Sequence, residues 1–213
     1  MGSDKTPSTP VVRRQPKGDG VEDLAIRFVN TKAWRLRDVA EERLGSPDAL
    51  FEWLDRNVTS PPKGLRQQRD WKDAAGLHAA AISLRESIYD ILTRRMLGVE
   101  PPSASLAYFN KCLSEPGAGA SIRFEAGALG WSFTKPTNDA LLRPIVLSGA
   151  ELMTGVRASK VRQCQDDRGC GWLFVDESRA QNRRWCSMGD CGNRAKAHRH
   201  YERTRRVGHG EDD

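Results

Sequence analysis

Four cysteines near the C-terminal end constrain this chain more than any other feature. They form two pairs, Cys164 with Cys170 and Cys186 with Cys191, and fourteen residues separate Gly171 from Cys186. Two cysteine pairs on either side of an apolar stretch are typical of a tetrahedral four-cysteine zinc site. The spacings within the pairs, five and four residues, are wider than the commonest spacing of about two. The pattern predicts one structural Zn²⁺ bound by these four cysteines.

A glycine follows the second cysteine of each pair, at Gly171 and Gly192. Glycine permits a tight turn that brings backbone N–H groups toward a metal-bound sulfur, so both glycines favour zinc. The alternative is two disulfides, which require an oxidising compartment. Residues 1–20 are polar, contain three prolines and lack the apolar core of a signal peptide, so we expect a cytoplasmic protein. A fifth cysteine, Cys112, has no metal-like spacing and is expected to be a buried thiol.

The sequence before the cysteines predicts a mainly helical domain. Leu24–Val29 fits either a strand or the first turns of a helix, while Ser46 and Pro47 are typical of a helix start. After the break at Pro61–Gly64, the longest helix is expected at about residues 65–97. Five apolar residues recur there at helical spacing and predict a buried stripe, namely Leu77, Ala81, Leu84, Ile88 and Ile91.

The polar residues of that long helix are expected to be mostly structural. His78 lies near the apolar stripe, where a hydrogen-bonded histidine is more common than a metal ligand. Its arginines are expected to lie mostly on the solvent side, namely Arg66, Arg69, Arg85, Arg94 and Arg95. A short helix through Cys112, a hairpin from Ser121–Glu125 and Trp131–Thr134, and a helix through Met153 should follow. No catalytic constellation, glycine-rich phosphate loop or apolar run of about 20 residues occurs.

The net charge of +6 is unevenly distributed along the chain. Residues 21–156 hold seventeen basic and seventeen acidic side chains, whereas residues 157–206 hold thirteen basic and six acidic ones. We therefore divide the chain into a disordered tail (1–20), a helical domain (21–156), a basic zinc module (157–206) and a disordered acidic tail (207–213). The predicted fold class is α+β, with a zinc-bound β-hairpin and a helix in the small module.

Within the zinc module, Trp172–Val175 is predicted to be a short strand, and Arg183–Trp185 leads back to the third cysteine, which suggests a hairpin with one cysteine pair near each end. About fifty residues bury too little surface to fold securely alone, so zinc should be a condition of folding. Residues 192–206 lack proline and predict a helix. Its docking side is expected to carry Ala197, Tyr201 and Thr204.

The opposite side of that helix carries a stripe of arginine and lysine. Eleven arginines and two lysines occur between residues 157 and 206, and the planar arginine fork suits phosphates and guanine edges. The alternative is a solvated charged face, but such faces usually mix signs. We predict nucleic-acid contacts by Arg179, Arg183, Arg184, Arg194, Lys196, Arg199, Arg203 and Arg206. His198 and His200 are expected to face solvent, a phosphate or an acidic neighbour.

The zinc module resembles the CGNR zinc finger, named for the residues that stand here as Cys191–Arg194. The similarity includes Cys170–Asp176, Arg183–Met188 and Lys196–Tyr201. Residues 21–156 resemble the ABATE domain, with an arginine at position 27 where relatives tend to carry an acidic residue. The resemblance implies a stress-induced bacterial transcription regulator whose finger binds DNA, and it implies zinc ligation by the same four cysteines.

Three functions remain open at this point. The first is a DNA-binding regulator whose N-terminal domain senses a small-molecule effector or forms a homodimer. The second is an RNA-binding module, because arginine and exposed aromatic residues also suit single strands. The third is an adaptor for an acidic protein partner. An enzyme is not expected, because four cysteines leave no open position on the metal.

Overall fold

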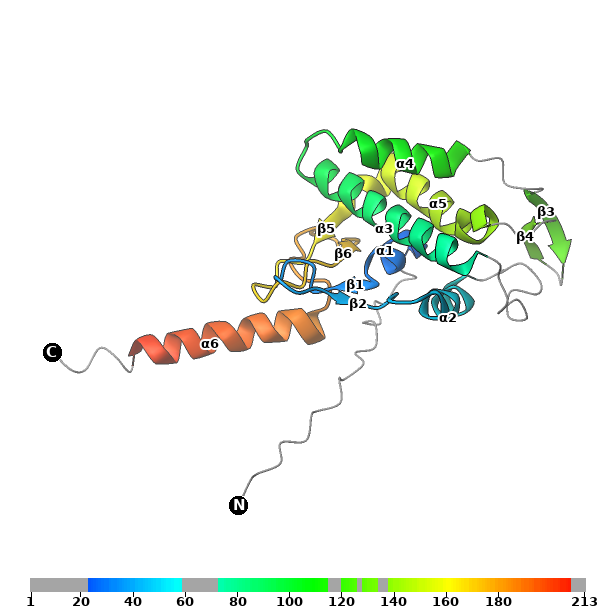
Figure 1. Cartoon of the computed structure of the whole chain (residues 1–213). Helices are drawn as coiled ribbons and strands as arrows, with labels where there is room; N and C mark the ends of the chain where they lie inside the picture. Colours follow the sequence, from blue (N-terminus) through cyan, green and yellow to red (C-terminus); the bar gives the residue numbers. More distant parts are fainter. Residues whose placement is uncertain (1–22, 59–72, 115–119, 126–127, 134–137, 208–213) are drawn as a thin grey trace, which may run out of the picture.

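The computed structural model describes residues 23–58, 73–114, 120–125, 128–133 and 138–207 (Figure 1). The predicted α+β fold is confirmed, with a mainly helical N-terminal part and a C-terminal part of short strands and one helix. The N-terminal elements are α1 (Leu24–Val29), β1 (Lys32–Ala33), β2 (Glu41–Glu42), α2 (Pro47–Asn57), α3 (Ala74–Met96), α4 (Ser103–Ser114), β3 (Ala120–Glu125), β4 (Ala128–Phe133) and α5 (Asn138–Thr154). The C-terminal elements are a 3₁₀ turn (Val156–Lys160), β5 (Val161–Gln163), β6 (Leu173–Val175), a π-helical turn (Met188–Gly192) and α6 (Asn193–Val207).

Helix α3 is the centre of the N-terminal part, and α1, α2, α4 and α5 all pack against it (Figure 1). The predicted stripe is confirmed, because all five of its apolar residues are buried. Phe28 of α1 and Trp53 of α2 extend the same core, with ring centroids 5.2 Å apart. Burial of this apolar surface is the main source of stability in this part of the molecule.

Side-chain caps set the beginnings of α2 and α3. Ser46 accepts a hydrogen bond from the N–H of Ala49, and Pro47 occupies the first helical position, as predicted. Helix α3 begins at Ala74, later than the predicted residue 65, because Asp73 is its N-cap and accepts from the N–H of Gly76. The segment Leu24–Val29, which fitted two readings, is helix α1.

One arginine of α3 lies on the opposite side from the one predicted. Arg85 is 1% exposed and buried beside the apolar stripe, whereas Arg94 and Arg95 are exposed as expected. Its guanidinium donates to both carboxylate oxygens of Glu42 and to Glu86. Burial is tolerated because these carboxylates neutralise the charge and satisfy its donors.

Other local predictions hold with small differences. Gly98 ends α3 with a φ of +67°, and His78 is a structural residue whose Nε2 lies 2.5 Å from the carbonyl oxygen of Leu44. Strands β3 and β4 pair antiparallel, as the hairpin prediction required. Helix α5 contains Pro144 in its interior and packs on α1. Cys112 is half-buried against the core.

The strand partner within the zinc module differs from the prediction. Strand β6 pairs antiparallel with β5, which precedes the first cysteine, and not with residues 183–185. Residues 183–185 form no strand; Arg184 instead accepts a backbone hydrogen bond from Gln165. Both cysteines of the first pair therefore lie in the connection between β5 and β6. Val161 and Leu173 of this hairpin are buried in the main core with α3.

The predicted tails, the Pro61–Gly64 break, Arg66 and Arg69 lie outside the described residues, except that α6 continues to Val207. Among the described residues, no helix is both long and apolar enough to cross a membrane.

Candidate metal centre

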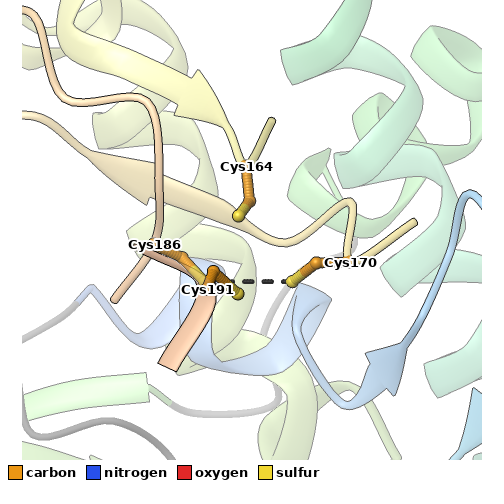
Figure 2. A group of neighbouring side chains, drawn as sticks. All are labelled: Cys164, Cys170, Cys186 and Cys191. Carbon is orange, nitrogen blue, oxygen red and sulfur yellow. Dashed lines mark hydrogen bonds between the residues drawn. The ribbon is translucent and has the colours of Figure 1, made fainter. Parts of the chain in front are cut away.

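The four predicted cysteines converge on one point of the structure. Cys164 follows β5, Cys170 lies in the β5–β6 connection, and Cys191 lies in the π-helical turn. Their sulfur atoms all lie within 4.8 Å of one another, and Figure 2 shows the side chains arranged around a common centre. The Sγ atom of Cys186 lies 3.6 Å from that of Cys191 and 3.8 Å from that of Cys170.

This geometry fits zinc. A tetrahedral site with Zn–S bonds of about 2.3 Å places its sulfur atoms about 3.8 Å apart. Hydrogen bonding with Cys170 lowers the pKa of the Cys164 thiol, whereas hydrogen bonding with Cys164 raises the pKa of Cys186. The thiols therefore do not ionise together on their own, and a divalent cation supplies the charge that four thiolates need. The four cysteines form a single structural zinc site.

The turns at the two glycines support the site in different ways. Gly171 has a φ of +67°, which is the left-handed conformation predicted for a tight turn. The N–H of Gly192 donates to the carbonyl oxygen of Ser187 at 2.9 Å, which closes the turn that contains Cys191.

Arg194 belongs to the support of the metal centre. Its Nη2 atom lies 2.8 Å from the sulfur of Cys191 and 2.9 Å from Asp166 Oδ2. Asp166 is 3% exposed, and hydrogen bonds from Arg168 and Arg194 lower its pKa although burial opposes this. The guanidinium thus joins one zinc ligand to a buried carboxylate, as is common around metal sites. Its predicted contact with nucleic acid stays a prediction, and this internal role was missed.

An N-terminal segment packs against the loop that carries Cys170. We call residues 32–44, which include β1 and β2, the arm. The N–H of Arg35 donates to the carbonyl of Cys170, and the N–H of Leu36 donates to that of Gly169, both at 3.2 Å. Arg37 Nε donates to the carbonyl of Arg168 at 2.6 Å. The arm therefore binds residues 168–170, which end at the second cysteine of the first pair, across more than 130 residues of sequence.

Two glycines make this close approach of backbones feasible. Gly169 has a φ of +86°, and a Cβ there would lie 2.8 Å from the side chain of Arg37. A Cβ on Gly171 would lie 2.8 Å from the side chain of Leu36. Sequence reasoning assigned Gly171 to zinc alone and missed the arm, because no local motif in residues 32–44 indicates a distant partner.

Tryptophans surround the four sulfurs. Trp172 is buried against them, and Trp34 of the arm and Trp185 pack at the edge of the same cluster. Arg37 stacks over Trp34 with its guanidinium carbon 3.6 Å from the ring centroid. The metal centre thus has a small core of its own, which is separate from the core around α3.

The eight basic residues predicted to contact nucleic acid differ in their surroundings. Arg179, Arg184, Lys196 and Arg199 are exposed. Arg183 and Arg194 are engaged in internal contacts. Arg203 and Arg206 lie on α6, but their side chains are outside the described part of the chain.

The internal contacts of Arg183 organise the segment before the third cysteine. Its backbone N–H donates to Asp176 at 2.8 Å, and its side chain donates to the carbonyl of Cys186 at 3.0 Å. The guanidinium also stacks on Phe174, with 4.9 Å to the ring centroid. Asp176 is fully buried, and hydrogen bonds from Ser178 and Arg183 lower its pKa although burial opposes this.

Helix α6 docks differently from the prediction. Ala195 is the residue buried against the module, whereas Ala197 and Tyr201, which were predicted to dock, are exposed. The phase of the helix follows from the π-helical turn that contains Cys191. His198 Nδ1 lies 3.2 Å from Asp167, which is the acidic neighbour expected for it.

Two family models match the chain. Residues 22–156 match the ABATE model, described as "Putative stress-induced transcription regulator", and residues 160–204 match the CGNR zinc finger. No curated protein matches the chain significantly. The two matches follow one another along the chain, as the resemblance of its residues implied.

Proposed function

Since this chain belongs to the ABATE family and carries a CGNR zinc finger, we propose that it is a transcription regulator that binds duplex DNA through α6. The observation that carries the proposal is the position of this helix. Helix α6 begins at Asn193, two residues after the last zinc ligand, and extends beyond the rest of the described structure (Figure 1). Its 15 residues span about 22 Å, and the major groove, about 12 Å wide, admits a helix of this kind.

The side chains on α6 suit a polyanion. Lys196 and Arg199 are exposed, and among residues 193–201 no acidic side chain occurs. Arg184 lies beside them, because its guanidinium and that of Arg199 both flank Trp185. The zinc site holds the N-terminal turn of the helix through Cys191 and Arg194, so the exposed residues are presented on a rigid support.

Binding to random duplex DNA at several salt concentrations tests this proposal. If α6 and its neighbours neutralise about five phosphates, log affinity should fall with log salt with a slope of roughly −4.5. Lys196→Ala and Arg199→Ala should each reduce the slope by about 0.9 and leave the melting temperature unchanged. Arg94→Ala, on the exposed side of α3, is the matched control.

The outcome also separates the alternatives. Absence of binding, or binding that does not depend on salt, would contradict the proposal. Stronger competition by structured RNA than by duplex DNA would favour the RNA-binding function. Loss of an acidic protein partner from the Arg199→Ala variant, without any nucleic-acid binding, would favour the adaptor.

We further propose that the protein is cytoplasmic and is not an enzyme. Its zinc module binds DNA, and its N-terminal part mediates dimerisation. Four thiolates complete the coordination of zinc, so the metal serves structure and not catalysis. One helix reads few bases, and dimerisation through the N-terminal part would double the contact. Light scattering with and without DNA tests this, and a monomer in both conditions would contradict it.

A further inference from the structure

A small cavity lies between the arm and the zinc module. It has a volume of about 40 Å³ and is lined by Trp34 and Arg43 of the arm and by Trp172, the residue before β6. Three of the four zinc-binding cysteines also line it, namely Cys170, Cys186 and Cys191. Since one water needs roughly 10–15 Å³ of such space, the cavity admits molecules of two or three heavy atoms.

The cysteines that line this cavity are arranged for reaction with each other. Cys186 is half-buried, whereas Cys164, Cys170 and Cys191 are buried. The sulfurs of Cys186 and Cys191 are 3.6 Å apart on one short segment, so the bond length of about 2.05 Å needs only a local movement. Cys170 is less free to move, because the arm binds its carbonyl through Arg35.

Polar groups that could orient a small oxidant are present beside the pair. The Nε1–H of Trp172 is buried and has no hydrogen-bond partner among the described residues. Arg194 Nη2 lies 2.8 Å from the sulfur of Cys191 and lines the same cavity. An indole N–H and a guanidinium can each donate to a peroxide oxygen.

We propose that Cys186 and Cys191 are a modification site for hydrogen peroxide. The sulfur of Cys186 attacks one peroxide oxygen, the O–O bond breaks, and the other oxygen leaves as water after taking a proton. The sulfur of Cys191 then attacks the Cys186 sulfenic acid and displaces hydroxide, which takes a second proton and leaves as water. Two thiolates, one peroxide and two protons give one disulfide and two waters.

The disulfide removes two of the four ligands of the metal. Asn193, the first residue of α6, comes two residues after Cys191, so the support of the basic helix is lost together with the zinc. Oxidation by a small peroxide would therefore release the helix from its fixed position. This inference adds a chemical input to the chain and does not depend on what α6 binds.

The test uses the zinc-loaded full chain with Cys112→Ser, so that the only thiols are those of the metal centre. Zinc release during peroxide treatment is followed with a chromogenic chelator, and the remaining thiols are alkylated and mapped by mass spectrometry. We expect one zinc released for each Cys186–Cys191 disulfide, with Cys164 and Cys170 alkylated. A disulfide that contains Cys164 would overturn the proposal. Zinc release that is no faster in peroxide than in buffer alone would overturn it as well.

The size of the oxidant gives a second readout. Glutathione disulfide at the same concentration should release zinc about tenfold more slowly than peroxide, because access limits reactions of thiols with bulky disulfides. Trp34→Ala enlarges the cavity and should remove most of this difference. Equal rates for both oxidants with the unaltered Trp34 would contradict entry through the cavity.

Discussion

The two parts of this molecule obtain their cores in different ways. Around α3 the buried residues are aliphatic and aromatic side chains, spaced along helices so that each turn adds one more to a continuous interior. Around the zinc site the core consists of four cysteines, Ala33 and tryptophans, held by hydrogen bonds to sulfur and to carbonyl groups. The comparison teaches that long amphipathic helices stabilise themselves by burial, whereas short strands and turns need a metal.

Two hydrogen bonds between Asn30 and Leu173 nevertheless join the two cores, and we call this contact the seam. Asn30, at the end of α1, donates to the carbonyl of Leu173 at 2.9 Å and accepts from its N–H at 3.0 Å. Leu173 itself lies in the core around α3. The zinc module therefore has its own core but is joined to the N-terminal part. Four experiments test how strongly the stabilities of the two cores are coupled.

Loss of the metal should have the largest effect. In Cys170→Ser, or after strong chelation, the zinc module should lose its fold, because structural zinc sites contribute about 10 kcal/mol or more at neutral pH. Amide hydrogen exchange should increase in residues 161–192 and at Arg35 and Leu36 of the arm, while the amides of α3 stay protected. Equal loss of protection in α3 would show that the two cores unfold together.

Replacement of Arg85 by alanine should have the next largest effect. Removing Arg85 leaves the carboxylate of Glu42 without the guanidinium that pairs with it, whereas Glu86 keeps its ion pair with Arg35, and we expect the loss to cost about 3 kcal/mol. Urea unfolding followed by circular dichroism measures this loss. Arg94→Ala on the exposed side of the same helix should change stability by less than about 0.5 kcal/mol. Similar values for both variants would contradict the buried role of Arg85.

The seam itself should contribute less. Asn30→Ala leaves the N–H and the carbonyl of Leu173 unsatisfied in a buried place, which we expect to cost about 2 kcal/mol. Because the seam joins both cores, zinc release to a competing chelator should also be faster in this variant. Unchanged zinc release with reduced stability would mean that the seam supports only the core around α3.

The smallest effect concerns acid stability within the zinc module. The folded pKa of Asp176 is lowered below the unfolded value of about 3.9. Its ionisation therefore stabilises the fold above about pH 4, and this contribution is lost as the pH falls through the folded pKa. The difference in unfolding free energy between the native chain and Asp176→Asn should shrink between pH 6 and pH 3. A difference that is independent of pH would contradict this.

Features defined by local spacing could be predicted from the sequence. The stripe of α3, the Ser46 cap and the four cysteines all follow from positions a few residues apart. Arg85 was misplaced because a charged residue was assumed to face solvent, although it lies four residues after Ala81 and three before Ile88, within the stripe. Its partner Glu42 is 43 residues away in sequence, which no periodicity reveals.

The geometry of the zinc module was less predictable for the same physical reason. Strand β5 has only three residues, Val-Arg-Gln. This is too short for an alternating apolar pattern to predict its pairing with β6. The side of α6 that packs on the zinc module depends on how the preceding π-helical turn rotates the helix about its axis. As a result, Ala195 is buried and the predicted Ala197 is exposed. The arm could not be predicted, because its contacts with Gly169 and Cys170 are backbone hydrogen bonds, which leave no side-chain pattern in residues 32–44.

The bonds between Asn30 and Leu173 connect residues that are 143 positions apart. During synthesis at about 5–20 residues per second, α1 and the arm emerge on the order of ten seconds before their partners. Closing so long a loop delays these contacts further, since non-local pairing is slow. The earliest segment of the described chain thus waits for a late one, and a nascent chain that stops before Leu173 leaves Asn30 and the arm without their partners and exposed to chaperones and proteases.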